Sequence, residues 1–395
     1  MQNTSLSDAV SVTETLIIGA GPAGLATAGC LRKQKQPFTL VEQADAIGSS
    51  WRRHYERLHL HTARQHSALP FLAFPRGTPR YPSRAQLIEY LELYARHFQI
   101  DPLFGCRALS LKRGDDRWIA DTSTGCFRAR RVVVATGVNA LPKVPSWPGR
   151  ERYRGEIIHS SDYRNGEPFR HRRVLVAGFG NSAGEIAVDL HEHGARVMLA
   201  VRDAVNVVPR DILGLPILSV SIGLSWLPSK VADALAAPLV RLTLGNIEQL
   251  GLRKSVHGPL TEIALRGRVP LLDHGTLRLI RAGNIEVMGE VTELGETSAH
   301  FRDGGSREVD AIIAATGFRS ELEHLLEPPE LPSPASKARH PGSTADHGLY
   351  FCGFAVSGTG MLRDIGIEAR RIAHHIAHAS RSNATPAREP LDRSP

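Results

Sequence analysis

The chain has few cysteines and no cysteine pair. Its 395 residues include only Cys30, Cys106, Cys126 and Cys352, and no two of these form a CxxC or CxxxxC motif. A disulfide framework is not expected in so long and cysteine-poor a chain, and the redox-active pair that disulfide reductases need is missing. Residues 1–15 carry neither the basic n-region nor the apolar h-region of a secretory signal. Together these absences favour a reducing, cytoplasmic setting.

Long apolar runs are also lacking. The longest uncharged stretch, 212–229, is interrupted by Pro216 and Pro228, so it is too short and too broken for an integral membrane span. We expect this stretch to line the core or a tunnel. The composition, 42% hydrophobic and 22% charged, excludes collagen-like, coiled-coil and wholly disordered chains. The length predicts two or three domains.

No block of basic residues occurs, although the net charge is +8. The cations are scattered and are not interleaved with aromatic residues, so the footprint of a nucleic-acid-binding protein is missing. A modest positive excess favours small anionic ligands such as dinucleotides and keto acids. The sequence has no HExxH motif, and His374 and His378 have no evident third partner. We therefore expect no metal site.

An approximate internal repeat is the main signal of organisation. Each unit opens with a short apolar strand, turns through glycines into a helix, passes a hairpin, and closes on a buried strand that ends in Ala-Thr-Gly. In chain order these parts are residues 15–18, 19–24, 114–116 and 131–137 in the first unit, and 173–177, 178–183, 303–305 and 311–317 in the second. Strands that alternate with helices predict an α/β fold with parallel sheets.

The first glycine turn has the pattern of a dinucleotide cradle. Gly19 permits the tight turn, Gly21 lets the backbone approach a pyrophosphate, and Gly24 allows close helix–strand packing. The helix that follows offers free N–H groups to phosphates. A second strand, 38–42, ends in Glu42, eighteen residues after Gly24. Its carboxylate can accept bonds from ribose hydroxyls and would repel a 2′-phosphate, so the site suits FAD or NAD.

The second glycine turn, 178–183, differs from the first in two ways. Ala183 stands in the place of the third glycine, which the motif allows. The strand at 196–201 is followed by Arg202 where the first unit has an acid. Because an arginine at this strand end can pair with a 2′-phosphate, the sequence predicts NADP(H), with Arg210 as a second phosphate contact.

A flavin site beside an NADPH site implies hydride transfer into the flavin. Since no cysteine pair is present, a disulfide reductase is disfavoured and a flavin monooxygenase, which uses O2 and no protein nucleophile, is favoured. Two alternatives stay open: an NADPH oxidase or flavin reductase without an organic acceptor, and a nucleotide-sensing protein that has kept only the fold.

The linker between the units, 153–163, resembles the FxGxxxHxxxY/F signature of class B flavin monooxygenases. Tyr153 replaces the first Phe of that signature, and Tyr163 stands where the Baeyer–Villiger type has Trp. Several further stretches look like the YUCCA-type branch of this family: the two glycine turns, 58–61, 81–86, 201–210, 272–276, 315–318 and 348–353. The resemblance therefore covers nearly the whole chain.

The resemblance implies a tightly held FAD, NADPH as donor, O2 and a small organic substrate. For the plant branch it implies oxidative decarboxylation of indole-3-pyruvate, a 2-oxo acid; N- or S-oxygenation is the alternative. By the resemblance, His61 aligns with an Asn that stabilises the flavin hydroperoxide in animal-type members. We expect His159 to order the linker rather than to transfer protons. The candidate catalytic residues are thus Asn181, His61 and His159.

The candidate cofactor-binding residues belong to the two turns and to the strand ends beside them. They are Gly19, Ala20, Gly21, Pro22, Ala23, Gly24, Glu42, Gln43, Trp51, Thr136, Gly137 and Gly353 for FAD, and Gly178, Gly180, Asn181, Ser182, Ala183 and Arg202 for NADPH. We expect two Rossmann-like domains, the second inserted into the first. The predicted boundaries are 1–163 and 322–380 for the FAD domain, 164–321 for the NADPH domain, and 381–395 for a disordered tail.

Overall fold

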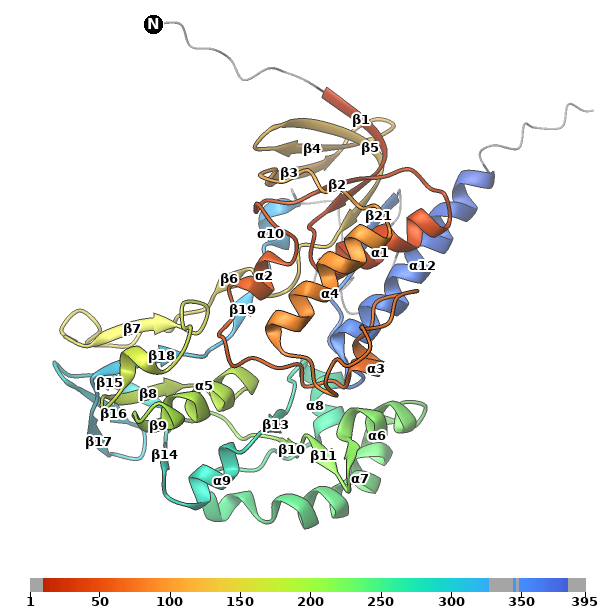
Figure 1. Ribbon diagram of the computed structural model, residues 1–395. Coiled ribbons are helices and arrows are strands. Elements are labelled where there is room, and N and C mark those ends of the chain that lie inside the picture. The colour runs from red at the N-terminus through yellow and green to blue at the C-terminus, as the bar shows by residue number, and fades with distance from the viewer. Residues whose placement is uncertain (1–9, 327–343, 346–347, 383–395) are drawn as a thin grey trace, which may run out of the picture.

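The structure, a computed structural model, describes residues 10–326, 344–345 and 348–382. Two sheets carry the fold, and Figure 1 shows them as separate layers with helices packed on them. The first sheet has the order β2-β1-β5-β21-β20, with β4 also paired to β5 and β3 paired to β4. Its strands are β1 (Val10–Ile18), β2 (Thr39–Val41), β3 (Ala108–Arg113), β4 (Trp118–Thr122), β5 (Gly125–Val134), β20 (Thr344–Ala345) and β21 (Leu349–Phe351).

The middle of the first sheet is parallel. Strand β1 pairs in parallel with both β2 and β5, and β21 pairs in parallel with β5. The inner half of β1, Leu16, Ile17 and Ile18, is fully buried, as a strand covered on both faces must be. Because β21 lies so late in the chain, the polypeptide returns to the first sheet after it has completed the second.

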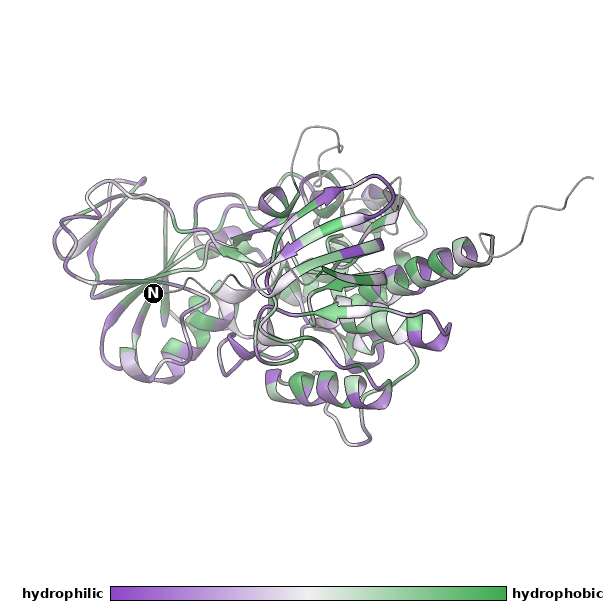
Figure 2. Ribbon diagram, turned by 90° about the horizontal axis from the view of Figure 1, so that it is seen from above, coloured by the Kyte–Doolittle hydropathy of each residue, from purple (hydrophilic) through white to green (hydrophobic). Residues whose placement is uncertain are grey.

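Three helices pack on the first sheet: α1 (Pro22–Lys33), α4 (Arg84–His97) and α12 (Met361–Ser382). Helix α4 begins with a capping box in which Ser83 accepts a bond from the Gln86 backbone and the Gln86 side chain accepts one from Ser83 N–H. Its Tyr90 and Tyr94 point into the core between α1 and α12. Figure 2 shows that hydrophobic residues gather in the strands, whereas α12 alternates between hydrophobic and hydrophilic residues.

The second sheet is wholly parallel, with the order β14-β9-β8-β18-β7. Its strands are β7 (Glu156–His159), β8 (Arg173–Ala177), β9 (Arg196–Ala200), β14 (Ile285–Met288) and β18 (Ala311–Ala314). Helices α5 (Asn181–Glu192) and α9 (Thr276–Arg281) pack on it. A small antiparallel sheet, β15 (Val291–Leu294), β16 (Ser298–Phe301) and β17 (Ser306–Glu308), lies beside it.

A helical subdomain, 212–266, is inserted within the second unit, between β9 and β14 of its sheet. It comprises α6 (Ile217–Leu224), α7 (Ser229–Leu244), the 3-10 turn η2 (Ile247–Leu250) and α8 (Pro259–Arg266). The remaining short elements connect these parts: α2 (Ser49–Arg52), α3 (Arg64–Ser67), α10 (Leu322–Leu325), η1 (Glu167–Phe169), β6 (Leu141–Pro142), β10 (Val207–Pro209), β11 (Asp211–Ile212), β12 (Leu215–Pro216), β13 (Leu271–Asp273) and β19 (Phe318–Arg319). Among the described residues, no helix is long and apolar enough to cross a membrane.

Two predicted boundaries need correction. The sequence analysis assigns residues up to 163 to the first domain, but β7 pairs with β18 in the second sheet. The predicted disordered tail begins at 381, whereas α12 continues through Ser382; residues 383–395 lie outside the described residues. The first boundary was placed too late because the sheet membership of β7 depends on a distant strand, and the second was placed two residues too early, inside the last turn of α12.

Candidate functional site

The first glycine turn connects β1 to α1. Gly19 has φ of +106°, and a Cβ there would lie 2.7 Å from the Ala135 carbonyl oxygen; at Gly24 it would lie 1.8 Å from the Gly19 carbonyl oxygen. Both glycines are therefore required by the fold itself. Gly21 is different, because a Cβ there would meet nothing within 4 Å. The space in front of Gly21 is open to a ligand.

Glu42 lies beside this turn, directly after β2. Its side chain is buried, and its Oε2 accepts a bond of 2.7 Å from the Ala20 N–H. Its Oε1 accepts bonds from the Ala44 N–H at 3.0 Å and from the Ser49 hydroxyl at 3.3 Å. Three donors thus fix the carboxylate at the end of the strand, next to the open face of Gly21.

A cavity of about 1260 Å³ adjoins the first turn. Many predicted FAD-site residues line it: Gly19, Gly21, Pro22, Ala23, Glu42, Gln43, Trp51, Thr136, Gly137 and Gly353. Ala20 and Gly24 are buried behind the turn. The Thr136 hydroxyl is buried without a partner among the described residues, which is the state expected of a group that bonds a ligand. The open Gly21, the fixed Glu42 and this hydroxyl fit a dinucleotide.

The second glycine turn, between β8 and α5, repeats the first. Gly178 has φ of +126° and would clash with the Ala315 carbonyl if substituted, whereas a Cβ at Gly180 would meet nothing within 4 Å. Ala183 is fully buried in the core of the second sheet. Asn181 begins α5 and lines the cavity, and its Oδ1 accepts a 2.8 Å bond from the Leu272 N–H. Asn181 therefore ties the turn to β13 at the cavity wall.

Arg202 lies at the surface, directly after β9. Its guanidinium pairs with Asp203 at 3.2 Å, and Arg268 pairs with the same carboxylate at 3.2 Å. Two exposed cations thus share one acid at this strand end, and the sequence analysis did not single out Arg268. Arg210, expected as a second phosphate contact, instead bonds His274 and Asp211 and stacks on the Tyr81 ring.

His159 and Trp51 hold parts of the structure in place. Both ring nitrogens of His159 have partners: Nδ1 lies 3.1 Å from the donating Ser161 N–H, and Nε2 lies 3.1 Å from the Gly317 carbonyl. His159 is buried and does not line the cavity. Trp51, on α2, packs against the cores of both sheets and also lines the cavity. It therefore lies where the two units meet.

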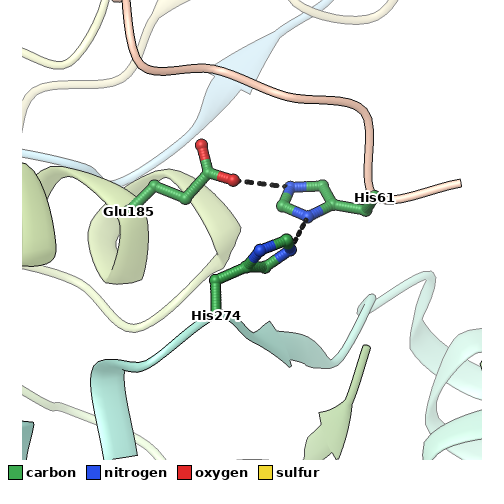
Figure 3. A group of neighbouring side chains, drawn as sticks. All are labelled: His61, Glu185 and His274. Atoms are coloured by element: carbon green, nitrogen blue, oxygen red, sulfur yellow. Dashed lines mark hydrogen bonds and ion pairs between the residues drawn. The ribbon is translucent and has the colours of Figure 1, made fainter. Parts of the chain in front are cut away.

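His61 lies on the cavity wall in a three-residue cluster that sequence reasoning missed (Figure 3). His61 Nδ1 is 3.0 Å from His274 Nε2, and His61 Nε2 is 3.6 Å from Glu185 Oε1. His61 comes from the loop before α3, Glu185 from α5, and His274 from the loop between β13 and α9. The cluster joins segments up to 213 residues apart, a distance over which no local spacing motif extends.

Burial sets the protonation of this cluster. Desolvation, reinforced by the Arg210 charge, lowers the pKa of His61 to about 4. Desolvation, His61 and Arg210 lower the pKa of His274 to about 3. Desolvation also raises the pKa of Glu185 to about 7, even though the Tyr55 hydroxyl and nearby arginines favour its ionised form. At neutral pH both histidines are therefore uncharged, and Glu185 is close to its midpoint.

The chain is similar to proteins of known activity. The profile of the pyridine nucleotide-disulphide oxidoreductase family matches residues 16–211. The indole-3-pyruvate monooxygenase YUCCA1 of Oryza sativa subsp. japonica is 39% identical over 88% of this chain and 88% of its own length. The probable indole-3-pyruvate monooxygenase YUCCA4 of Arabidopsis thaliana is 36% identical over 93% and 90%, respectively.

Solved structures share the fold at lower identity. A flavin-containing monooxygenase from Stenotrophomonas maltophilia superposes with a TM-score of 0.70 at 20% identity and covers 94% of this chain and 99% of its own. A cyclohexanone monooxygenase superposes with a TM-score of 0.73 at 18% identity and covers 94% and 89%. The α/β architecture with Rossmann-like parallel sheets is thus shared.

Proposed function

We infer the function from the premise that this chain belongs to the YUCCA-like flavin monooxygenase family and is a flavin-dependent monooxygenase. Membership implies a flavin and a nicotinamide dinucleotide. We propose that the first sheet with its returning strand β21 forms the FAD unit. We propose that the second sheet forms the NADPH unit. The single observation that carries the proposal is the identity with the indole-3-pyruvate monooxygenases along nearly the whole chain.

The residues around the first turn fit FAD. The Gly21 backbone would face the pyrophosphate at the N-terminus of α1, Glu42 would accept bonds from ribose hydroxyls, and Thr136 would use its unpartnered hydroxyl. A bound flavin supplies the hydride acceptance and the oxygen activation that no side chain can supply. The chain binds it, orients it and excludes water.

NADPH is proposed at the second turn. Gly180 leaves room for the pyrophosphate at the start of α5, and Arg202 with Arg268 would hold the 2′-phosphate at the end of β9. The pair would have to give up part of its hold on Asp203, which is favourable because a dianionic phosphate attracts two guanidiniums more strongly than one carboxylate does. Asn181 would position the nicotinamide end at the cavity wall.

The proposed substrate is a 2-oxo acid such as indole-3-pyruvate. The cavity is lined by apolar residues of α6 and α7, among them Leu218, Leu224 and Val240, and by the cations Arg241 and Lys254. Apolar walls with a few cations suit an aromatic carboxylate. The reaction would release CO2 and leave the carboxylic acid that is one carbon shorter.

A substrate panel tests the proposal. The purified flavoprotein is mixed with NADPH, O2 and one candidate substrate at a time: the 2-oxo acid indole-3-pyruvate, an amine or a sulfide. The masses of the products are measured by mass spectrometry. We expect loss of CO2 with gain of one oxygen for indole-3-pyruvate only, with NADPH consumption matching product. Oxygen gain by the amine or the sulfide would assign N- or S-oxygenation. Consumption of NADPH with stoichiometric H2O2 and no organic product would assign an oxidase.

A further inference from the structure

The cluster of His61, His274 and Glu185 continues into a fourth residue. Arg210 lies 2.9 Å from His274 Nδ1. Its guanidinium is held in place by Asp211 at 3.2 Å and by the Tyr81 ring at 4.3 Å. The Tyr81 hydroxyl in turn donates a 2.6 Å bond to Asp211. Arg210 is therefore a fixed donor, not a mobile surface cation.

A fixed arginine gives the chain of bonds one direction. A guanidinium has donors and no acceptor, so His274 Nδ1 must accept. A neutral imidazole that accepts at Nδ1 carries its proton on Nε2, and His274 Nε2–H then donates to His61 Nδ1. By the same rule the proton of His61 is on its Nε2. Arg210 thus locks His274 in one tautomer, and His274 locks His61 in the same one.

The same bonds argue against a metal ion, although the ligand atoms of the three residues lie within 4.8 Å of one another. An ion on His274 Nε2 would require a proton on Nδ1, which would then face the N–H groups of Arg210. Histidine ligands normally donate that second N–H to an acceptor. The arginine would also repel the cation across a short, partly buried distance.

The locked proton on His61 has only a weak partner. Glu185 Oε1 lies 3.6 Å away, beyond a normal hydrogen bond, and Glu185 Oε2 is buried with no partner among the described residues. The side chain of His61 is 22% exposed, and His61 lines the cavity. A ligand oxygen that approached Nε2–H would therefore displace very little.

We propose that Arg210 and His274 lock His61 as a neutral donor, and that its Nε2–H binds an oxygen atom of the ligand in the cavity, in place of its long contact with Glu185. Arg210 and His274 are positioning residues, since they act through His61. The inference rests on the proposed function for the identity of that ligand, but the tautomer lock does not depend on it.

The charges around the cluster are compatible with a neutral donor. The groups that face it are Tyr55, Arg57, His59, Tyr81, Asp189, Arg210 and Asp211. Burial lowers the pKa of His61, and the charges of Arg210 and His59 lower it further. His61 therefore stays neutral across the physiological range, and the lock chooses only which nitrogen carries the proton.

Nitrogen-15 NMR of the histidine-labelled holoenzyme tests the lock directly, because ring nitrogens with and without a proton differ strongly in chemical shift. We expect both His61 and His274 to carry the proton on Nε2 between pH 6 and pH 8. Arg210→Met should give mixed tautomers, and Arg210→Lys, which still donates, should restore the wild-type pattern. Arg154→Met removes an exposed arginine paired with Glu296 and should change nothing.

Turnover and metal binding complete the test. Arg210→Met should lower kcat by up to about 100- to 1000-fold, the cost of losing one oriented donor outright. The change in KM for NADPH should be smaller, and Arg210→Lys should recover most of kcat. A proton on Nδ1 of either wild-type histidine, or one Zn²⁺ bound per chain and lost in His274→Gln, would overturn the proposal. If Arg210→Met does not fold, the tautomers of His61 and His274 in the wild-type NMR spectrum decide whether the lock exists. A correct lock with an unexpected substrate would contradict only the proposed function.

Discussion

Two residues that end equivalent strands, Glu42 after β2 and Arg202 after β9, have opposite surroundings. Glu42 is buried and accepts three bonds from its own unit, so its side chain is held in position before any ligand binds. Arg202 is exposed and shares Asp203 with Arg268. The end of β2 is thus preorganised to bind hydroxyl groups. At the end of β9, by contrast, the arginines must leave Asp203 before they can bind a ligand.

Arg202 should set the choice between the two nicotinamide cofactors. In Arg202→Glu we expect KM for NADPH to rise about tenfold or more, because a 2′-phosphate would then face an anion, while KM for NADH changes little. Steady-state kinetics with both cofactors measure this, and Arg302→Glu, at an exposed arginine in the turn after β16, is the control. Equal effects on NADPH and NADH would contradict the assignment.

His274 should make stability depend on pH. Its native pKa is lowered to about 3, so between this value and 6.5 the unfolded chain binds the proton more readily. The stability that neutral His274 contributes to the folded protein is therefore present above pH 6.5 and is lost as the pH falls. The stability difference between wild type and His274→Gln should therefore shrink by on the order of 1 kcal/mol from pH 7 to pH 5.

Urea unfolding at pH 7, 6 and 5 measures this difference. Glu185, whose pKa is raised to about 7, works in the opposite direction, but it is present in both proteins. His300→Gln, at an exposed position on β16, is the control for replacing a histidine outside the cluster. A constant difference for His274→Gln at all three pH values would mean that the ring titrates normally in the native state.

At the scale of elements, the glycine turns contain some glycines that the fold requires and others that only a ligand requires. Gly24→Ala would place a Cβ 1.8 Å from the Gly19 carbonyl oxygen, so we expect a loss of several kcal/mol or no folded protein. In Gly21→Ala and Gly180→Ala the added Cβ meets open space. The free energy of unfolding of both variants should therefore stay within about 1 kcal/mol of the wild-type value.

Cofactor assays on the two open positions then identify the sites. Gly21→Ala should purify with little flavin, because the added methyl group blocks the approach of the backbone to the pyrophosphate. Gly180→Ala should keep its flavin and show a raised KM for NADPH. The absorbance ratio after gel filtration and steady-state kinetics measure both effects. Flavin loss in Gly180→Ala, with full retention in Gly21→Ala, would exchange the two assignments.

Local signals made these elements predictable from the sequence. Both turns, the hairpins near 114–116 and 303–305 and the opening strands follow patterns that span fewer than ten residues. The membership of β7 in the second sheet was missed because it depends on pairing with β18, far along the chain. The contact of His61 with His274 was missed for the same reason. His61 and the segment that holds His274 were singled out through the resemblance alone.

At the scale of the whole molecule, the end of the chain completes the beginning. Helix α12 packs against α1 and α3, and its Glu368 accepts a 2.7 Å bond from the Gly353 N–H at the cavity. A defect in α12 should therefore reach the flavin site even though it lies more than 300 residues from Gly19. Within the described residues, the core clusters of the second sheet include no residue of β21.

A pair of matched core substitutions tests this dependence. Ile376 lies fully buried in the core between α1, α4 and α12, and Ile313 is equally buried in the second sheet. We expect Ile376→Ala and Ile313→Ala each to lower the free energy of unfolding by about 2–4 kcal/mol. Only Ile376→Ala should also lower flavin retention, because only there does the lost packing loosen the helix that holds Gly353. Equal flavin loss in both variants would mean that the two cores act as one cooperative unit.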